Sequence, residues 1–424
     1  MNLFKQISSK IYKNKLEISV LGLGYVGLPV AHSFSKKFKV IGFDINKKRI
    51  KELKKNFDNN RSITKKDLKN SNIDFTSNFK NMRNSEILII TTPTPINLSK
   101  NPDLKFIFKA LKFIALLGIK NKIIILESTV YPGASETKFI KYLEMLTGLS
   151  VNKDFFYGYS PERINPGDKI NTFKNIAKIV SGSNMKTSEI IYQLYKKVVN
   201  NVHKASSILS AETSKLIENS QRDLNVAFVN EISIICNKLK IQSSEALKLA
   251  STKWNFLNFS PGLVGGHCIG VDPYYLFYSS KKLGYKPKAL LAGRILNESY
   301  HKFLVKKFLN YFNKKKINIL LMGATYKANC NDLRNSKSLE IFKILKKRNY
   351  KIDIYDPNIN KKKIKNFKFV KNPRKKFYDG IIISVDHAIF KKMGYKKILT
   401  YGKKNCKIFD IKNLFPNKKN MIYL

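Results

Sequence analysis

Apolar residues in the first half of the chain gather in short runs, separated by longer stretches in which they recur every three to four positions. Short runs bounded by glycine, proline or hydroxyl residues predict buried strands, and the longer repeats predict helices. We expect strands at 17–22, 39–44, 86–95, 122–130 and 155–162, with helices such as 103–117 and 133–146 between them. Strands that alternate with helices predict a parallel sheet covered by helices, in a domain that ends near residue 205.

The pattern changes at 210–240, which contains neither glycine nor proline. Its apolar positions are spaced mostly by three or four residues and lie at 217, 224, 228, 232, 235 and 239. This period predicts one long amphipathic helix, with Ser210 as a candidate N-cap. Further helical patterns at 243–251 and 288–312 predict a central helical domain.

Strand patterns return after residue 316. Four apolar runs, at 317–323, 351–357, 380–386 and 406–411, and one helical pattern at 336–348 predict a second, smaller α/β domain. A chain of 424 residues is too long for one ordinary core. The predicted fold is therefore α/β, with two Rossmann-like doubly wound domains joined by a central helical domain, and the predicted boundaries are 1–205, 206–312 and 313–424.

Composition and hydropathy narrow the cellular setting. Lysines interrupt every apolar run before the 18 or so residues that a membrane helix needs, and the N-terminus lacks the apolar core of a secretory signal. The chain has four cysteines, none of them in a CxxC pair: Cys236, Cys268, Cys330 and Cys406. This pattern favours a reducing compartment and argues against a zinc site, so we expect a cytoplasmic protein without membrane contact, disulfide or bound metal.

The formal net charge is +51, from 80 basic and 29 acidic residues, and a value of this size can indicate a nucleic-acid partner. Here the excess is almost all lysine, spread evenly among many Asn, Ile and Phe residues, as a compositional bias would produce. No arginine-rich arm or zinc-finger spacing accompanies it. We therefore predict weak nonspecific binding to polyanions and no specific nucleic-acid partner.

The sequence GLGYVG follows the first predicted strand and opens a helix, which is the context of a dinucleotide-binding turn. Gly22 allows the turn, Gly24 lets a pyrophosphate approach the backbone, and Gly27 lets the helix pack on the strand. Asp44 ends the second strand, where its carboxylate can accept the ribose hydroxyls and favours NAD over NADP; Arg49 weakens that preference slightly. The cofactor contacts predicted here are Gly22, Gly24, Tyr25, Val26, Gly27, Asp44 and Arg49.

Hydroxyl residues follow two further predicted strands, in TTPTP and ESTVYPG. Ligands of open α/β sheets bind at the carboxyl ends of the strands, so these hydroxyls are candidate NAD contacts. An ordinary loop cap is the alternative for each of them. The residues are Thr92, Thr94, Ser128 and Thr129.

Lys215 and Asn219 lie four residues apart on the long helix, hence on one face, with Arg222 close to the same stripe. A solvated helix face is the simpler interpretation. However, a lysine can stabilise a developing oxyanion and an asparagine can orient the reacting oxygen. This stripe is therefore a candidate catalytic surface.

Cys268 lies in the glycine-rich sequence GGHCIGVD, followed four residues on by Asp272. A free cysteine is usually a small buried apolar residue, and the nucleophile interpretation stays open beside that one. An NAD enzyme with a cysteine nucleophile suggests oxidation of an alcohol to an aldehyde, then through a thiohemiacetal and a thioester to an acid. Glu162 could activate the water that releases the acid, or it could form a salt bridge with its neighbour Arg163.

Six motifs occur in a fixed order: GLGYVGLP, ESTVYPG, GYSPERINPGD, AETSKLIENSQRDLN, GGHCIGVDPYYL and GATYKANCNDLRNSK. In these the chain resembles the UDP-glucose/GDP-mannose dehydrogenase family, and most of all its UDP-N-acetylhexosamine 6-dehydrogenase branch, of the Vi-antigen and O-antigen type. The resemblance implies an NAD domain, a central dimerisation domain and a UDP-binding domain. It further implies a homodimer that oxidises C6 of a UDP-sugar to a carboxylate, with two NAD per turnover, for a surface polysaccharide such as a capsule.

The resemblance also implies residue roles. Cys268 would be the nucleophile, Lys215 and Asn219 the oxyanion and substrate contacts, and Glu162 and Asp272 the acid and base. The further substrate contacts would be Arg163, Ile164, Arg222, Gly265, Tyr326 and Lys327, and Arg334 would reach NAD. Two positions depart from the family pattern, which has arginine where this chain has Ser260 and Lys412; lysine keeps the charge but loses the bidentate geometry.

Three alternatives remain open. The sugar of the substrate could be that of UDP-glucose or UDP-ManNAc. A β-hydroxyacid dehydrogenase would also join a Rossmann domain to a long helix with a Lys/Asn pair, but it transfers one hydride and needs no thiol. A noncatalytic protein that binds NAD or polyanions would make the Lys215, Asn219 and Cys268 set incidental.

Overall fold

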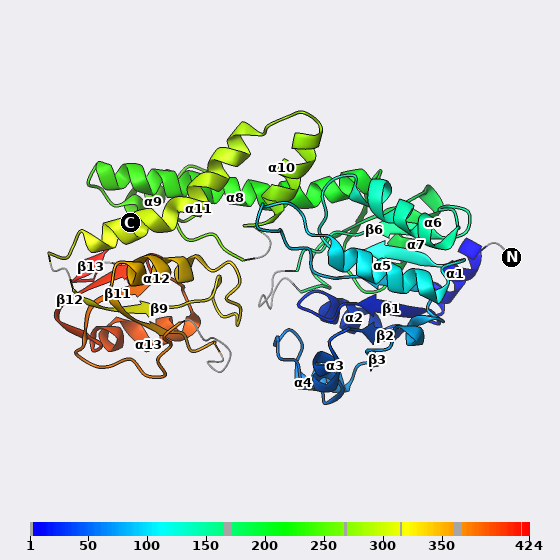
Figure 1. Ribbon diagram of the computed structural model, residues 1–424, viewed down its shortest axis with the longest axis horizontal. Coiled ribbons are helices and arrows are strands. Elements are labelled where there is room, and N and C mark those ends of the chain that lie inside the picture. The colour runs from blue at the N-terminus through cyan, green and yellow to red at the C-terminus, as the bar shows by residue number, and fades with distance from the viewer. Residues whose placement is uncertain (1–2, 165–171, 267–268, 314–315, 360–366, 417) are drawn as a thin grey trace. The chain divides into compact units, whose positions relative to one another are not determined.

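The computed structural model describes residues 3–164, 172–266, 269–313, 316–359, 367–416 and 418–424. The chain forms two compact units, of which the first comprises Met1–Glu218 and Tyr274–Tyr285 and the second comprises Asn219–Pro273 and Lys286–Leu424. Each unit is built around a sheet of mainly parallel strands with helices packed on it (Figure 1). The α/β fold with two sheets and one long helix is therefore confirmed.

The sheet of the first unit has the strand order β3-β2-β1-β4-β5-β6-β7-β8. Its strands are β1 (Glu17–Leu21), β2 (Lys39–Phe43), β3 (Ile73–Thr76), β4 (Ile87–Ile90), β5 (Ile123–Leu126), β6 (Phe156–Tyr159), β7 (Lys178–Gly182) and β8 (Val202–Lys204). Neighbouring strands are parallel except for β6 and β7, which are antiparallel. The sequence pattern missed β3, β7 and β8, which are short and half-polar.

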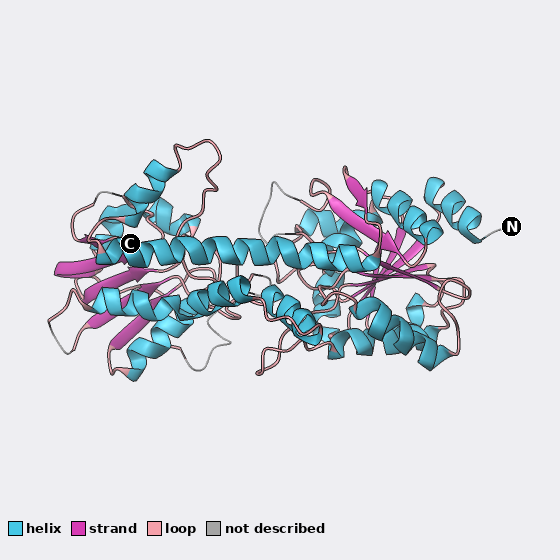
Figure 2. Cartoon of the chain, turned by 90° about the horizontal axis from the view of Figure 1, so that it is seen from above, coloured by secondary structure: helices cyan, strands magenta, loops and turns pink. Residues whose placement is uncertain are grey.

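Helices cover both faces of this sheet (Figure 2). They are α1 (Leu3–Tyr12), α2 (Gly27–Ser35), α3 (Lys47–Lys54), α4 (Lys65–Lys69), η1 (Phe79–Met82), α5 (Lys105–Leu117), η2 (Ser135–Ile140), α6 (Lys141–Thr147) and α7 (Met185–Lys196). One buried apolar cluster joins α1, α2 and α7 to β1, β2 and β4. Burial of this surface fixes where β1 ends, and hence where the glycine turn begins.

Helix α8 (Ile208–Lys238) is continuous over 31 residues, as the periodicity predicts. It begins two residues before the predicted cap. The Ser207 hydroxyl accepts the backbone N–H of Ser210 at 3.0 Å, so Ser207 is the capping residue and the assignment of this role to Ser210 is wrong. Helix α10 (Asp272–Lys282) was not predicted, because its sequence lacks a clear apolar stripe.

The second unit contains α9 (Ser243–Ala250), α11 (Lys288–Leu309), α12 (Lys337–Lys347) and α13 (Ala388–Leu399). Its sheet has the order β10-β9-β11-β12-β13, formed by β9 (Asn318–Met322), β10 (Lys351–Tyr355), β11 (Tyr378–Ile383), β12 (Gly402–Asp410) and β13 (Met421–Ile422). All of these strand pairs are parallel. This arrangement confirms the second α/β region that the pattern predicted.

Helices α8 and α11 are joined by a buried polar network. The Arg294 guanidinium lies 2.6 Å from the Asp223 carboxylate, and both side chains are almost fully buried. Asn297 donates to the same carboxylate at 2.8 Å and accepts a hydrogen bond from Asn230, also at 2.8 Å. Such a network is stable only when all its members are present, because each would otherwise be a buried polar group without a partner.

Several predicted elements are shorter than expected. The run at 86–95 forms a strand only over Ile87–Ile90, because the prolines in TTPTP cannot donate to a neighbouring strand.

None of the described helices is long and apolar enough to cross a membrane.

Candidate active site

The glycine turn lies where the sequence predicts it, between β1 and α2. Gly22 has φ +97°, a conformation that favours glycine, and a Cβ on Gly27 would lie 1.8 Å from the carbonyl oxygen of Gly22. Gly24 is exposed, and a Cβ there would meet nothing within 4 Å. The turn is therefore tightly packed on its inner side and open above Gly24, which suits the approach of a pyrophosphate to the N-terminus of α2.

Asp44 stands beside this turn. Its two carboxylate oxygens accept the backbone N–H groups of Leu23 at 2.9 Å and Asn46 at 2.8 Å, and the side chain stays partly exposed. Each oxygen keeps a lone pair for a ribose hydroxyl. Arg49 is buried instead, because its Nε donates to the carbonyl of Leu23 at 2.9 Å and a terminal nitrogen lies 2.8 Å from Asp58. Its guanidinium thus supports the turn from below.

Hydroxyl residues at the ends of β4 and β5 complete this edge. The Thr91 hydroxyl donates to the carbonyl of Gly22 at 2.7 Å, a contact that sequence reasoning missed. Ser128 donates to the carbonyl of Thr92 at 2.7 Å, which is a structural role. The Thr92 hydroxyl itself is buried and has no hydrogen-bond partner in the described chain, whereas Thr94 and Thr129 are half-buried. An unpartnered buried hydroxyl beside an open glycine turn fits a dinucleotide ligand.

Glu162 is buried after β6 and does not pair with Arg163. One of its oxygens accepts the backbone N–H of Ile164, and the other lies 3.3 Å from the amine of Lys178. Arg163 pairs with Glu218 and donates to the carbonyl of Ala177 at 2.9 Å. The salt-bridge alternative for Glu162 is therefore correct in kind, but its partner is a lysine that the sequence did not single out.

Lys215 is buried on α8, 7% exposed, which excludes a solvated helix face as the reason for its position. Burial alone would raise the pKa of Glu162, but the charges of Lys178 and Lys215 hold that pKa below its usual value. The two predicted catalytic groups, Glu162 and Lys215, thus interact electrostatically within the first unit. Glu162 is kept as a carboxylate, able to accept a proton.

Asn219 and Asp272 are brought together in the second unit. The Asn219 amide donates to the Asp272 carboxylate at the N-terminus of α10. Asp272 is 3% exposed, whereas Arg222 is exposed. Cys268 and His267 lie outside the described residues. The next residue, Ile269, accepts a hydrogen bond through its carbonyl from Arg294 at 3.3 Å.

The glycines before the cysteine pack against the loop that follows β9. A Cβ on Gly265 would lie 2.6 Å from the carbonyl oxygen of Asn335, and one on Gly266 would lie 2.5 Å from the ring of Tyr326. The Asn335 amide donates to the carbonyl of Gly266 at 3.1 Å. The glycines that precede Cys268 and the loop with Tyr326 and Lys327, both expected from the family resemblance to bind the nucleotide sugar, therefore touch.

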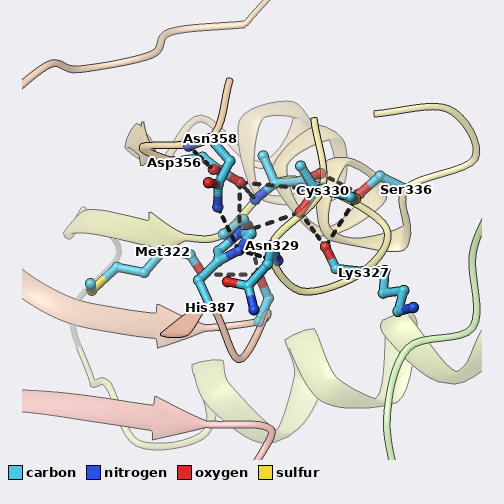
Figure 3. Close-up of polar contacts among 12 residues, drawn as sticks. Met322, Lys327, Asn329, Cys330, Ser336, Asp356, Asn358 and His387 are labelled. Atoms are coloured by element: carbon cyan, nitrogen blue, oxygen red, sulfur yellow. Dashed lines mark hydrogen bonds and ion pairs between the residues drawn. The ribbon is translucent and has the colours of Figure 1, made fainter. Parts of the chain in front are cut away.

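A buried histidine fixes the loop that follows β9 (Figure 3). His387 Nδ1 accepts the backbone N–H of Asn329 at 2.9 Å and lies 2.8 Å from the side-chain nitrogen of Asn358. Because a backbone N–H can only donate, the ring proton belongs on Nε2, which lies 3.1 Å from Asp356. Cys330 donates to the carbonyl of Lys327 at 3.1 Å within the same loop, and Arg334 pairs with Asp332.

This loop repeats the glycine turn of the first unit. Gly323 follows β9 with φ +88°, and Ser384, at the end of β11, donates to its carbonyl at 2.7 Å. Asp356, at the end of β10, accepts the backbone N–H groups of Ala324 at 2.7 Å and Asn358 at 2.9 Å. One difference stands out: the Asp356 carboxylate is fully buried beside the histidine ring, whereas its counterpart in the first unit is partly exposed.

The two positions that depart from the family pattern line one cavity of about 320 Å³ in the second unit. Ser260 and Lys412 both contribute to its wall. The Lys412 amine lies 2.7 Å from where a Cβ on Gly262 would be, so the lysine leans over the glycine of the Pro-Gly pair. Both departures therefore change the same part of the molecule.

An open glycine turn with a partly exposed aspartate beside it, on a doubly wound sheet, is the arrangement of a dinucleotide-binding domain. Family models of the UDP-glucose/GDP-mannose dehydrogenase family match residues 16–199 (NAD binding domain), 209–299 (central domain) and 320–417 (UDP binding domain). The chain belongs to this family. It is thus an NAD-dependent oxidoreductase of the nucleotide-sugar dehydrogenase class, and its C-terminal region is of the UDP-binding type.

Named relatives share most of the chain. It is 45% identical to Protein CapL of Staphylococcus aureus over 94% of this chain and 96% of that one. It is 44% identical to the UDP-N-acetyl-D-glucosamine 6-dehydrogenase of Pseudomonas aeruginosa, over 96% and 99% of the two chains. A solved structure of the UDP-D-ManNAc dehydrogenase of Pyrococcus horikoshii superposes with a TM-score of 0.86 at 29% identity, covering 95% of this chain and 97% of that one.

Proposed function

We propose that this enzyme oxidises the C6 alcohol of a UDP-N-acetylhexosamine, UDP-GlcNAc or UDP-GalNAc, to the uronic acid. The observation that carries this proposal is Glu162, a buried carboxylate that Lys178 and Lys215 keep ionised inside an NAD-dependent dehydrogenase. A dehydrogenase that stops after one hydride transfer must take a proton only from the alcohol, whereas one that releases an acid must also activate water and needs a further base for that step. The relatives named UDP-N-acetyl-D-glucosamine 6-dehydrogenase, at 44% and 42% identity, support the choice of sugar.

In the proposed mechanism, Lys215 stabilises negative charge on the C6 oxygen, and Asn219 orients that oxygen. NAD, when bound at the glycine turn and Asp44, supplies the hydride acceptor for both oxidation steps. The Cys268 thiolate adds to the aldehyde carbon to form a thiohemiacetal, because an aldehyde carries no second transferable hydride. Glu162 then takes a proton from the water that attacks the thioester, and the C–S bond breaks with its electron pair returning to sulfur. Asp272, the other acid/base group, takes the proton that the C6 hydroxyl loses in the first oxidation step.

The further substrate contacts that we propose are Arg163, Ile164, Arg222, Gly265, Tyr326, Lys327 and Lys412, with Arg334 as a further NAD contact. Lys412 would meet the uridine end with a single charged amine in place of a forked guanidinium. Its position beside Ser260, in one cavity, supports a local change in how the nucleotide is held. Catalysis itself would not depend on either residue.

The experiment that tests this function is an NADH assay of the purified chain with NAD and each of UDP-GlcNAc, UDP-GalNAc, UDP-ManNAc and UDP-glucose. We expect two NADH per sugar consumed, and a uronic acid as product, with UDP-GlcNAc or UDP-GalNAc. Preference for UDP-ManNAc or UDP-glucose would transfer the proposal to that sugar. One NADH per sugar would indicate a single hydride transfer, and no NADH from any UDP-sugar would refute the function.

We further propose that the enzyme is a homodimer formed through its central region. Phe228 and Ile235 lie seven residues apart on α8, hence on one side, and are 54% and 46% exposed. In the same unit, Trp254 is 91% and Ile295 60% exposed. Exposed large apolar side chains of this kind favour a protein interface, and a two-fold dimer is the commonest way to cover one.

Replacing Ile235 by lysine is expected to shift the protein from two chains to one, because it places a charge within the apolar surface. Light scattering after size-exclusion chromatography measures the change. The control is Leu116→Lys on α5, which changes a comparably exposed leucine (60%) outside this surface. A wild-type protein that is monomeric at micromolar concentration would refute the proposal.

In this proposal, residues 1–205 form the NAD-binding domain, 206–312 the dimerisation domain with the cysteine loop, and 313–424 the UDP-binding domain. We place the enzyme in the cytoplasm, where NAD is held and where thiols stay reduced, because the described cysteines Cys236, Cys330 and Cys406 are all unpaired. Its product would supply the synthesis of a surface polysaccharide, such as a capsule or O-antigen.

A further inference from the structure

Glu162 belongs to a buried cluster of charged side chains. The Lys178 amine is 2.6 Å from Glu127 and 3.3 Å from Glu162, and the side chains of all three are at most 9% exposed. The hydroxyl of Tyr195, on α7, donates to the other oxygen of Glu127. The rings of Phe173 and Tyr195 lie 5.2 and 5.6 Å from the amine. This cluster belongs wholly to the first unit.

The strand order explains how these residues meet. Glu127 follows β5 and Glu162 follows β6, so both carboxylates stand at the carboxyl edge of the parallel sheet. Strand β7 runs antiparallel to β6, with Gly158 opposite Gly182 and Tyr159 opposite Ser181. Continued by three residues, the same register brings Glu162 opposite Lys178, the first residue of β7. The antiparallel direction of β7 therefore places the amine of Lys178 at the same edge of the sheet as Glu162.

The charges in this cluster do not balance as an ordinary ion pair would. One buried amine faces two buried carboxyl groups, and removing such charges from water costs free energy. Glu162 is fixed through both oxygens, one by Lys178 and the other by the backbone N–H of Ile164. Because both of its oxygens are held, the Glu162 carboxylate is fixed in one orientation.

The pKa values of Glu127 and Glu162 are shifted in opposite directions. Burial, together with the nearby charge of Glu162, raises the pKa of Glu127 to about 7. Burial acts on Glu162 as well, but the charges of Lys178 and Lys215 hold its pKa below the usual value. Separated pKa values of this kind identify which of two carboxyl groups stays ionised and can act as a base. Here that group is Glu162.

We propose that Lys178 is a positioning residue that holds Glu162 fixed and ionised for the water attack that releases the acid. The inference rests on the proposed function, in which Glu162 accepts the proton of that water. The water oxygen bonds to the thioester carbon, its proton passes to Glu162, and the electron pair of the broken C–S bond returns to Cys268. Lys178 contacts neither substrate nor cofactor in this scheme and acts only through Glu162.

The first test is Lys178→Met, followed by stopped-flow NADH formation and by mass spectrometry of the intact protein. We expect the first NADH burst to keep its rate, whereas steady-state turnover falls at least about tenfold. The thioester should accumulate as a covalent adduct on the protein. The acid limb of the turnover profile should move to higher pH, because burial raises the pKa of Glu162 and the charge of Lys178, the largest influence that opposes burial, is then gone.

Lys178→Met leaves two buried carboxylates without their cation, and this variant could fail to fold. A second comparison therefore uses Glu127→Gln as the background and adds Lys178→Met to it, which removes one charge of each sign. The double variant should accumulate the adduct relative to its background. Lys178→Arg should restore turnover, since it returns the charge.

The matched control is Lys122→Met, at the opposite end of β5. Lys122 is also a lysine with its amine engaged, donating to the carbonyls of Arg83 at 2.7 Å and Ser85 at 2.6 Å, but it contacts no carboxylate of the cluster. It should lose stability without accumulating adduct. If the Lys178 variants slow burst and turnover equally, or behave like Lys122→Met, the positioning role is wrong. A wild-type enzyme that makes no NADH would refute the proposed function instead.

Discussion

The Cys268→Ser variant is expected to lose acid formation by roughly three orders of magnitude or more, the largest effect of any single change that we propose. A serine hydroxyl is a poor nucleophile at neutral pH without a base to activate it. Without the thiohemiacetal, the aldehyde carries no hydride for the second oxidation. The reaction should therefore stall after one NADH, and the measurements are NADH absorbance and mass spectrometry of the sugar product.

The control for this variant is Cys236→Ala. Cys236 lies on α8 and is 4% exposed, so it serves packing, and its loss should lower stability without changing the number of NADH per sugar. A Cys268→Ser enzyme that still makes two NADH per sugar at close to the wild-type rate would exclude the thioester route. The single-hydride β-hydroxyacid dehydrogenase scheme would then become the better account.

Arg294→Met is expected to lower the free energy of unfolding by about 3–5 kcal/mol. It would leave the Asp223 carboxylate buried without its cation, and it would also remove the donor to the carbonyl of Ile269, next to the cysteine. Burial raises the pKa of Asp223, and Arg294 opposes that rise, so the carboxyl should become protonated in the variant at higher pH than in the wild type. Urea denaturation followed by circular dichroism measures the loss.

Arg374→Met is the matched control, because Arg374 also pairs with an aspartate, at 3.1 Å, but is 54% exposed. Its loss should be far smaller. Replacing Asp223 by leucine together with Arg294→Met should recover much of the stability, since no charge is then left buried. Equal losses for the two arginine variants would show that the buried pair contributes no more than a surface pair.

Local sterics made the dinucleotide site readable from the sequence. Gly22 and Gly27 occupy positions where a side chain would be strained or would collide with backbone, so only glycine fits, and the spacing reports the turn directly. Asp44 could be placed because the end of a strand next to the turn can be recognised from its apolar run. Thr91 was missed, because its contact with the Gly22 carbonyl depends on the order of the strands in the sheet.

Groups that act through long-range pairing could not be predicted. Lys178 is one of many lysines in the chain, and only the antiparallel register of β7 distinguishes it from the others. The contacts of His387 could not be predicted either, because it contacts Asn329 and Asp356 only when three strands of the second sheet have assembled. Their sequence neighbours carry no pattern that would reveal either contact. The residue roles derived from the family resemblance remain predictions, to be tested by the variants above.

The difference between the two glycine turns indicates that one chain binds one dinucleotide at a time. Of the two aspartates at these turns, Asp356 is fully buried next to the ring of His387, whereas Asp44 is partly exposed and accessible to a ribose. In the proposed mechanism, the first NADH would then depart and fresh NAD would enter while the half-oxidised sugar is still attached to the enzyme. A covalent bond to sulfur would thus act as a tether, keeping a reactive aldehyde from escaping during the exchange of cofactor.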